Sequence, residues 1–197
     1  MKKKVDELKI DLRRNLCTIG GPVASNITAI GMGYCLNDPS KYNTDLPYIF
    51  DLTLGGKLRG KTLNQIRKES ASKEYNWWII DSSNRKPKYI PEQSYFKYRE
   101  TRYRVDYGMI IVKYHPVEEL REKGKKLLIL AGCHGEGTLA CVEALRNVEI
   151  LRQIKSKREG SEEFQAIIKA EISGYRRIDA QKFLQKYRKY LKKIKIN

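Results

Sequence analysis

The segment Lys125–Leu145 constrains the fold of this chain more than any other, because it predicts a strand, a glycine-rich loop and a helix in direct succession. The run Leu127–Ala131 is apolar without alternation, which is typical of a strand that is covered on both faces. Three glycines follow this strand: Gly132, Gly135 and Gly137. Thr138 is the predicted N-cap of the helix. Such a loop presents backbone N–H groups and the positive end of a helix dipole, and this combination suits a phosphate or another anion.

The spacing of these glycines supports two interpretations. It matches neither the GxxxxGKS/T phosphate-binding loop nor the GxGxxG dinucleotide-binding loop. The glycines either contact a ligand or only allow a tight connection between strand and helix. Both interpretations carry similar weight, because the loops at the carboxyl ends of strands are where open α/β sheets bind ligands.

A second unit of the same kind lies near the N-terminus. Residues Asn15–Ile19 predict a short strand, and the apolar residues from Val23 to Tyr34 recur at helical spacing. The loop between them consists of Gly20, Gly21 and Pro22. Ser25 and Asn26 fall in the first turn of the helix, where they either reach a ligand or make local hydrogen bonds to the helix start.

The two units are expected to form one crevice. If their strands are neighbours in a parallel sheet, both loops emerge at the same edge, and Gly21 faces Gly135 across a single pocket. The predicted ligand-binding residues belong to the two glycine loops and to the helix starts behind them: Gly20, Gly21, Pro22, Ser25, Asn26, Gly132, His134, Gly135, Gly137 and Thr138.

Three titratable residues are candidates for chemistry in this crevice. Glu136 beside a bound sugar or phosphate can act as a general base, and His134 can act as an acid or bind a phosphate. Asp106, at the start of a predicted strand, is a further candidate. Structural roles are the alternative, with Glu136 as a solvated residue of the first helical turn and His134 as a cap of a backbone group. The sequence alone does not decide whether the protein is an enzyme.

Length and composition predict a single domain without a metal or a cofactor. The 197 residues are enough to bury a sizeable core. No apolar run approaches the roughly 20 residues that span a bilayer, and the basic N-terminus lacks the apolar segment of a signal peptide. Four cysteines form no CxxC pair and only two histidines are present, so a zinc site is not expected. We predict a cytoplasmic protein with reduced cysteines in its core and no contact with a membrane.

The formal net charge of +17 favours an anionic partner: a nucleotide, a nucleic acid or an acidic protein. Residues 178–197 predict a basic amphipathic helix that docks on the domain and leaves its lysines in solvent. No base-reading motif accompanies the basic residues, so nucleic-acid binding is expected to be non-specific and salt-sensitive. A homo-oligomer is compatible with this composition. Abundant Lys, Ile and Tyr with few Gln is typical of a thermophilic prokaryote.

The remaining elements are predicted from periodicity and from turn residues. Strands are expected at residues 48–54, 75–81, 94–98, 104–114 and 163–175. The last of these alternates apolar and polar residues, as a half-buried strand at a sheet edge does. Short helices are expected at residues 1–14, at residues 63–70 and after Pro116, and loops at residues 37–47 and 82–94.

Three short motifs occur in a recognisable order: Ile19–Asn26, Asp106–Ile110 and Ala131–Thr138. Together they resemble the GGPxxN … DYG … AGxxGxGT pattern of a Rossmann-like module found in archaeal S-layer-like proteins and in some uncharacterised prokaryotic regulators. The resemblance covers residues 15–175 and implies a ligand crevice between the motifs. The chain departs from the surface-protein version, because it shows neither a signal peptide nor an anchor. No catalytic residue is implied by the resemblance.

These observations lead to one prediction of fold and three of function. We expect a single Rossmann-like α/β domain at residues 15–177, with a mixed, mostly parallel sheet and helices on both faces, a helical extension at residues 1–14 and a docked helix at residues 178–197. The leading function is binding of a nucleotide or another phosphate-bearing ligand by a sensor or regulatory module. One alternative is hydrolysis of a nucleotide or N-glycosidic bond with Glu136 as base. The other is a nucleic-acid-binding or assembly protein that uses the basic surface.

Overall fold

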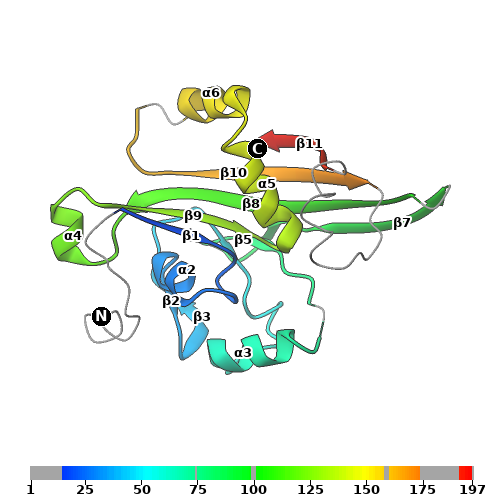
Figure 1. Ribbon diagram of the computed structural model, residues 1–197. Helices are drawn as coiled ribbons and strands as arrows, with labels where there is room; N and C mark the ends of the chain where they lie inside the picture. Colours follow the sequence, from blue (N-terminus) through cyan, green and yellow to red (C-terminus); the bar gives the residue numbers. More distant parts are fainter. Residues whose placement is uncertain (1–14, 74, 99–100, 158–159, 174–190, 197) are drawn as a thin grey trace.

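The computed structural model describes residues 15–73, 75–98, 101–157, 160–173 and 191–196, and it shows an α/β protein built on a six-stranded mixed sheet (Figure 1). The predicted helix at residues 1–14 lies outside the described residues. The strand order is β1-β9-β8-β10-β11, and β7 pairs with β8 beside this path. These strands are β1 (Leu16–Ile19), β7 (Glu92–Tyr98), β8 (Thr101–Tyr114), β9 (Lys126–Gly132), β10 (Phe164–Ser173) and β11 (Leu191–Ile196).

The prediction of a mostly parallel sheet is wrong. Among the described strands of this sheet, β1 and β9 pair in parallel, whereas the pairs β8–β9, β8–β10, β10–β11 and β7–β8 are antiparallel. Parallel strands need a crossover of about a dozen or more residues that returns the chain to the same end of the sheet. The connection from Tyr114 to Lys126 holds only the short helix α4 (Glu118–Glu122), so β8 and β9 run antiparallel. The unbroken apolar run of β9 reflects burial on both faces and carries no information on strand direction.

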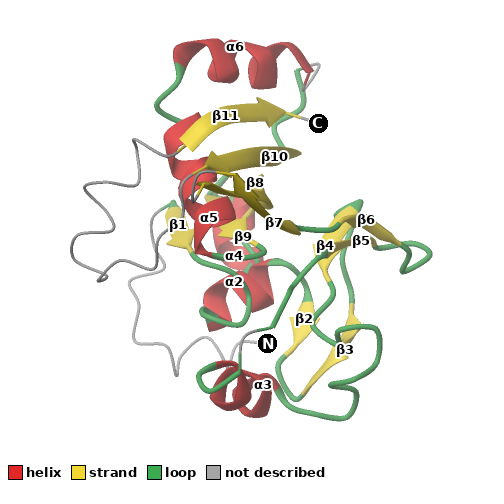
Figure 2. Cartoon of the chain, turned by 90° about the vertical axis from the view of Figure 1, so that its right-hand side faces the viewer, coloured by secondary structure: helices red, strands yellow, loops and turns green. Residues whose placement is uncertain are grey.

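Two apolar layers lie against the sheet, one on each face, because side chains of successive strand residues point to opposite sides. Leu127 and Ile129 belong to the layer that includes α2 (Asn26–Gly31). Leu130 belongs to the other layer, which includes α5 (Gly135–Ala144) and α6 (Val148–Lys157). Figure 2 shows α6 and α2 on opposite sides of β8, β9 and β10.

Two small antiparallel sheets stand beside α2. One pairs β2 (Tyr34–Cys35) with β3 (Asp38–Tyr42), and the other joins β4 (Tyr48–Phe50), β5 (Ile79–Asp81) and β6 (Pro87–Tyr89). The prediction of a loop throughout residues 37–47 is therefore wrong, and so is the prediction that the first helix reaches Tyr34. Gly33 explains the early end of α2. Its φ is +87°, and a Cβ at this position would lie less than 3.0 Å from the carbonyl oxygen of Asn43.

The strand predicted at residues 48–54 ends at Phe50 because Asp51 starts a turn. The Asp51 carboxylate accepts hydrogen bonds from the backbone N–H groups of Thr53 (2.9 Å) and Gly55 (2.7 Å), which gives these groups partners outside a sheet. The helix predicted at residues 63–70 is confirmed as α3 (Leu63–Ser70). Its N-terminus carries a capping box, in which Thr62 and Gln65 exchange hydrogen bonds between side chain and backbone.

The C-terminal residues correct a further prediction. Residues 191–196 were expected to continue a basic helix, but they form β11, which pairs antiparallel with β10. The sequence Ile194-Lys195-Ile196 alternates apolar and polar residues with the period of a strand. A short segment whose apolar residues fit both a helix and a strand becomes a strand where a neighbouring strand, here β10, offers backbone groups for pairing. As a consequence β10 lies inside the sheet between β8 and β11, and not at its edge. Residues 174–190 are outside the described ranges.

The cysteines are only partly in the core, contrary to the prediction. Cys133 and Cys141 are buried, whereas Cys17 and Cys35 are exposed, and none of these four described residues forms a disulfide. Burial raises the pKa of the Cys141 thiol strongly and raises that of Cys17 to a smaller extent. None of the helices in the described ranges combines the length and the apolarity needed to cross a bilayer.

These burial differences predict the order in which the thiols react. A thiol reagent at mildly alkaline pH should label Cys35 first and Cys17 next, because a raised pKa leaves less of the Cys17 thiolate at a given pH. Cys141 should react only as fast as the protein opens, and Cys133, which is 3% exposed, should react more slowly than the two exposed thiols. Peptide mapping after timed labelling measures this order, and labelling in denaturant, where all four sites should react alike, is the control. Labelling of native Cys141 as fast as that of Cys35 would contradict the structure.

Candidate functional site

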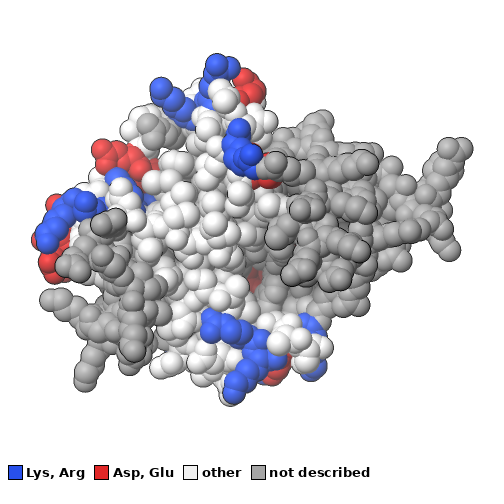
Figure 3. All heavy atoms as spheres, in the orientation of Figure 1, with Lys and Arg blue, Asp and Glu red and all other residues white. Residues whose placement is uncertain are grey.

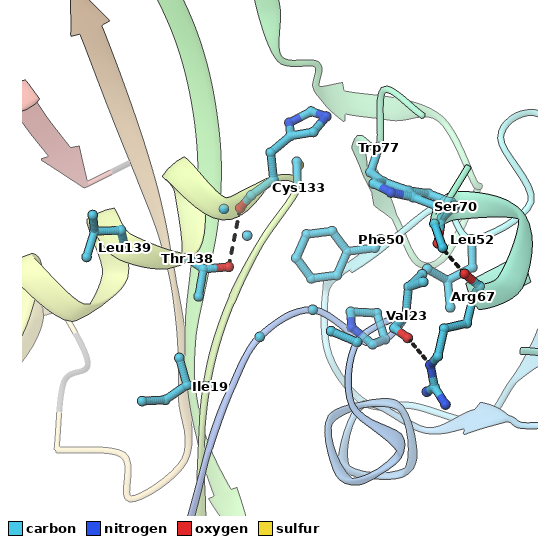
Figure 4. Close-up of a pocket in the computed structure, with 18 of the residues that line it drawn as sticks. Ile19, Val23, Phe50, Leu52, Arg67, Ser70, Trp77, Cys133, Thr138 and Leu139 are labelled. Carbon is cyan, nitrogen blue, oxygen red and sulfur yellow. Dashed lines mark hydrogen bonds between the residues drawn. The ribbon is translucent and has the colours of Figure 1, made fainter. Parts of the chain in front are cut away.

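A pocket of about 710 Å³ lies where the two glycine loops meet (Figure 4). β1 and β9 are parallel neighbours, with Ile19 beside Leu130, so the predicted pairing of these two strands is confirmed. The N–H of Gly20 donates to the carbonyl oxygen of Leu130 (2.8 Å), which continues the pairing into the first loop. A Cβ on Gly21 would lie 3.3 Å from the carbonyl oxygen of Gly132, so the backbones of the two loops touch.

The pocket wall is mainly apolar and has a few polar groups. Apolar side chains come from the ends of β1 and β4, from the segments that follow these strands, from the segment before β5 and from α5: Ile19, Val23, Phe50, Leu52, Trp77, Leu139 and Val142. The polar side chains on the wall are Arg67, Ser70, His134 and Thr138. Figure 4 shows Phe50 between Thr138 on one side and Trp77 with Leu52 on the other. The structure thus brings Gly20, Gly21, Pro22, Gly132, His134, Gly135 and Thr138 to one pocket.

Ser25 and Asn26 lie outside this wall and support the first loop instead. Ser25 is the N-cap of α2, and its Oγ accepts a hydrogen bond from the N–H of Thr28 (3.2 Å). The buried Thr28 hydroxyl donates to the carbonyl oxygen of Gly20 (3.0 Å) and lies 2.9 Å from the hydroxyl of Thr18. These bonds fix the loop, in which Gly20 has a φ of +116°. Of the two roles expected for Ser25, the structure shows local hydrogen bonding at the helix start.

Arg67 of α3 is a pocket residue that the sequence did not reveal, as are Phe50, Leu52, Ser70 and Trp77. Its Nε donates to the carbonyl oxygen of Val23 (2.6 Å), and its Nη2 donates to the Oδ1 of Asn26 (2.8 Å). The buried residues Leu63 and Ile66 orient α3 so that Arg67 reaches the first loop. Its Nη1 also donates to the Oδ1 of Asn64 (3.3 Å), and the N–H groups that remain can bind an anion at the pocket wall. The amphipathic pattern of residues 63–70 indicates a helix, but it does not indicate that this helix packs against the first glycine loop.

The second loop is shorter than predicted. The helix α5 begins at Gly135 with His134 as N-cap, and not at Thr138. The N–H of Thr138 already makes a helical hydrogen bond to the carbonyl oxygen of His134 (3.2 Å). Gly135, Glu136 and Gly137 therefore belong to the first helical turn. This turn has an anion of its own, because the N–H of Gly137 donates to the Oδ2 of Asp106 (2.6 Å).

Close packing accounts for two of the three glycines in this unit. A Cβ on Gly132 would lie less than 3.0 Å from backbone atoms of Gly137 and Thr138. A Cβ on Gly137 would approach the carbonyl group of Tyr107 equally closely, so α5 rests directly on β8 and β9. Gly135 differs, because no heavy atom lies within 4 Å of its ideal Cβ position. Gly137 is also absent from the pocket wall, so its packing role does not require a ligand.

Asp106 and His134 form a pair in which His134 lies at the pocket wall and Asp106 lies behind it. Asp106 has no exposed surface, and its Oδ1 lies 3.1 Å from the Nδ1 of His134. The Nε2 of His134 lies 3.2 Å from the carbonyl oxygen of Tyr75. Asp106 also accepts from the backbone N–H groups of Tyr107 (2.9 Å) and Gly137, which is the pattern of an ionised carboxylate. A neutral imidazole donates one hydrogen bond, so both contacts of His134 are hydrogen bonds only when its ring is doubly protonated.

The three candidates for chemistry thus differ in their access to the pocket. His134 lines it, whereas Asp106 and Glu136 do not, and Glu136 is only 5% exposed. Asp106 contacts His134 and can influence the pocket only by orienting this side chain. Proton transfer to a ligand would therefore involve His134 before Glu136, although both nitrogens of His134 already have partners. Within the described ranges, no group of three or more histidine, cysteine or acidic residues is arranged to hold a metal ion.

Comparisons with protein-family models, with curated proteins and with solved structures find no match to this chain. The fold and the pocket define an α/β protein with a mainly apolar cavity at the carboxyl ends of a parallel strand pair.

Proposed function

We propose that the pocket binds a nucleotide or another phosphate-bearing small molecule, and that the protein acts as a sensor or regulatory module. One observation carries this proposal: an aromatic and aliphatic wall, a guanidinium group and two glycine loops meet in a single cavity. Ligand sites in proteins are typically concave, mostly apolar and equipped with a few polar groups that orient the ligand. The parallel pair β1–β9, with α2 and α5 behind its loops, also supports a Rossmann-like classification as part of this proposal.

The apolar and the polar parts of the pocket wall suit different parts of such a ligand. The flat, apolar part packs against Phe50, Leu52 and Trp77, since aromatic side chains stack well on planar rings. The anionic part lies at Arg67 and the first glycine loop. The second loop is less suited to an anion than the sequence indicated, because Asp106 already occupies the N–H of Gly137 with a negative charge.

Binding fits this geometry better than hydrolysis does. A general base needs a nitrogen or oxygen with a lone pair directed at the reacting proton. Both ring nitrogens of His134 instead face the oxygen atoms of Asp106 and Tyr75. We therefore expect nucleotides that stabilise the protein to remain intact in its presence. Chromatography of the nucleotide after prolonged incubation measures this, and steady turnover that is lost in Glu136→Gln would favour the hydrolase instead.

Titration calorimetry with purine and pyrimidine mononucleotides tests the binding itself. We expect at least one of them to bind, and Arg67→Gln to weaken it about tenfold or more, because a charge-assisted hydrogen bond to phosphate is lost. Trp77→Ala should weaken it by a similar factor through loss of stacking area. Arg152→Gln on α6 is the matched control, since it removes an arginine from an exposed site on the other face of the sheet.

Thermal melting without ligand shows whether each variant is folded. If no mononucleotide binds, or if Arg67→Gln and Trp77→Ala bind as well as the wild type, the pocket does not have this function.

A further inference from the structure

A basic segment flanks the pocket on the side of α3. Residues 57–73 contain six lysines and arginines and a single acidic residue, Glu69. The segment is held in place by a small apolar cluster of Leu54, Leu58 and Ile66, against which Val23 and Trp77 of the pocket wall pack. Figure 3 shows Lys and Arg side chains gathered at this end of the visible face. The basic segment therefore packs directly against the pocket wall and is not part of a separate lobe.

Much of this charge is not neutralised within the segment. Lys61 forms an ion pair with Glu69. Lys57, Arg59 and Lys68 are exposed, and among the described residues no carboxylate lies within ion-pair distance of them. Arg59 also lines a smaller hollow of about 190 Å³, which shares Phe50 and Leu52 with the pocket. The unpaired cations thus continue from Arg67 outward over the surface.

We propose that the nucleotide in the pocket is the terminal residue of a single-stranded nucleic acid. Its base lies in the apolar pocket, and the phosphates that follow lie along residues 57–73. This inference rests on the proposed nucleotide-binding function and specifies the class of ligand. A single phosphate group needs little more than Arg67 and the first loop. The cations Lys57, Arg59 and Lys68 provide further positive charge beyond Arg67, which is matched by a chain of phosphates.

A single strand fits the pocket better than a duplex does. A base that is paired and stacked inside a duplex cannot enter a pocket without being flipped out, whereas an end of a single strand has a free base. Aromatic walls combined with a positively charged track are the usual means of binding single strands without sequence preference. Trp77 and Phe50 provide the first feature, and the basic segment provides the second.

Fluorescence anisotropy with an octamer of thymidylate, labelled at one end or the other, tests the inference against thymidine monophosphate as competitor. We expect the octamer to bind at least about tenfold more tightly than the monophosphate, and a label at the end that enters the pocket to weaken binding. A triple variant, Lys57→Gln with Arg59→Gln and Lys68→Gln, should reduce the affinity of the octamer to about that of the monophosphate. The slope of log affinity against log salt should fall by about 2, since three phosphate contacts are lost.

The matched control is a second triple variant, Arg152→Gln with Lys155→Gln and Lys157→Gln, which removes the same charge from α6 on the other face of the sheet. It should change the affinity of the octamer by less than about threefold, because long-range effects of charge are screened at physiological salt. An equal loss in both triple variants would show that only net charge matters and would overturn the inference.

The remaining outcomes separate this inference from the proposed function. If the monophosphate binds as tightly as the octamer, the pocket binds small molecules and the inference is wrong. If neither ligand binds, both are wrong. If Trp77→Ala leaves binding of the octamer unchanged, or if a blunt duplex binds equally well, the nucleic acid lies on the surface and not in the pocket, and the inference again fails.

Discussion

Gly137→Ala is expected to lower the free energy of unfolding by about 3 kcal/mol, whereas Gly135→Ala, two residues earlier in the same helix, should change it by less than about 1 kcal/mol. A Cβ at position 137 would lie less than 3.0 Å from the carbonyl carbon and oxygen of Tyr107 in β8. These are backbone atoms in a paired strand, so they cannot turn away as the end of a side chain can. The helix α5 would have to lift off the sheet and lose contacts in its buried layer.

The pair of variants isolates packing from helix propensity. Both replacements put alanine in the first turn of α5, and no heavy atom lies within 4 Å of the ideal Cβ at Gly135. Urea unfolding followed by circular dichroism measures both free energies. Two variants of equal stability would mean that α5 does not rest on β8 as closely as the structure shows, and the packing interpretation of Gly137 would be lost.

Local patterns predicted the elements that position the pocket. The run Leu127–Ala131 and the residues Asn15–Ile19 predicted β9 and β1, and the two loops with their glycines predicted that both strands end at one crevice. These features depend on residues that are close in sequence, such as an apolar run followed by glycine. The strands at residues 94–98 and 104–114 and the helix at residues 63–70 were predicted for the same reason.

Strand direction and helix starts were less predictable. The apolar run of β8 and β9 reflects burial on both faces, which parallel and antiparallel strands share. Thr138 has the right chemistry for an N-cap, but the helix begins earlier because Asp106, about thirty residues away in sequence, provides a partner for the N–H of Gly137. The sequence around Thr138 does not indicate that a carboxylate of β8 binds the first turn of this helix.

The polar part of the pocket shows the same limit. Arg67 reaches the first loop through α3, and its hydrogen bonds to Val23 and Asn26 connect segments more than forty residues apart. The sequence predicted His134 and Glu136 in one crevice, with Asp106 as a further candidate. The structure gives them unequal access, because the orientation of the first helical turn buries Glu136 and exposes only His134 to the pocket.

Asp106→Ala should be as damaging as any single substitution in this protein, with a loss of about 4 kcal/mol in the free energy of unfolding. The change takes the acceptor away from three donors, the N–H groups of Gly137 and Tyr107 and the Nδ1 of His134. Removing one member of a buried pair costs far more than the pair contributes, because the remaining polar group stays desolvated. Asp45→Asn is the control, because it removes a carboxylate that is paired with Lys113 but is 70% exposed, and it should cost no more than about 1 kcal/mol.

A double-mutant cycle of Asp106→Ala with His134→Gln separates the contact with His134 from the other two. If the pair is coupled as its 3.1 Å separation indicates, His134→Gln should cost much less in the Asp106→Ala background than in the wild type, by about 1 kcal/mol or more. Urea unfolding at neutral pH provides the four free energies. Additive effects, or a cost of Asp106→Ala close to that of Asp45→Asn, would show that the carboxylate does not hold the first turn of α5. In that case Asp106 would not account for the first turn of α5, and the argument against the second glycine loop as the place for an anion would be lost. A large, coupled loss instead means that Asp106 itself fills part of this helix N-terminus, which supports the proposal that a phosphate lies on the side of Arg67.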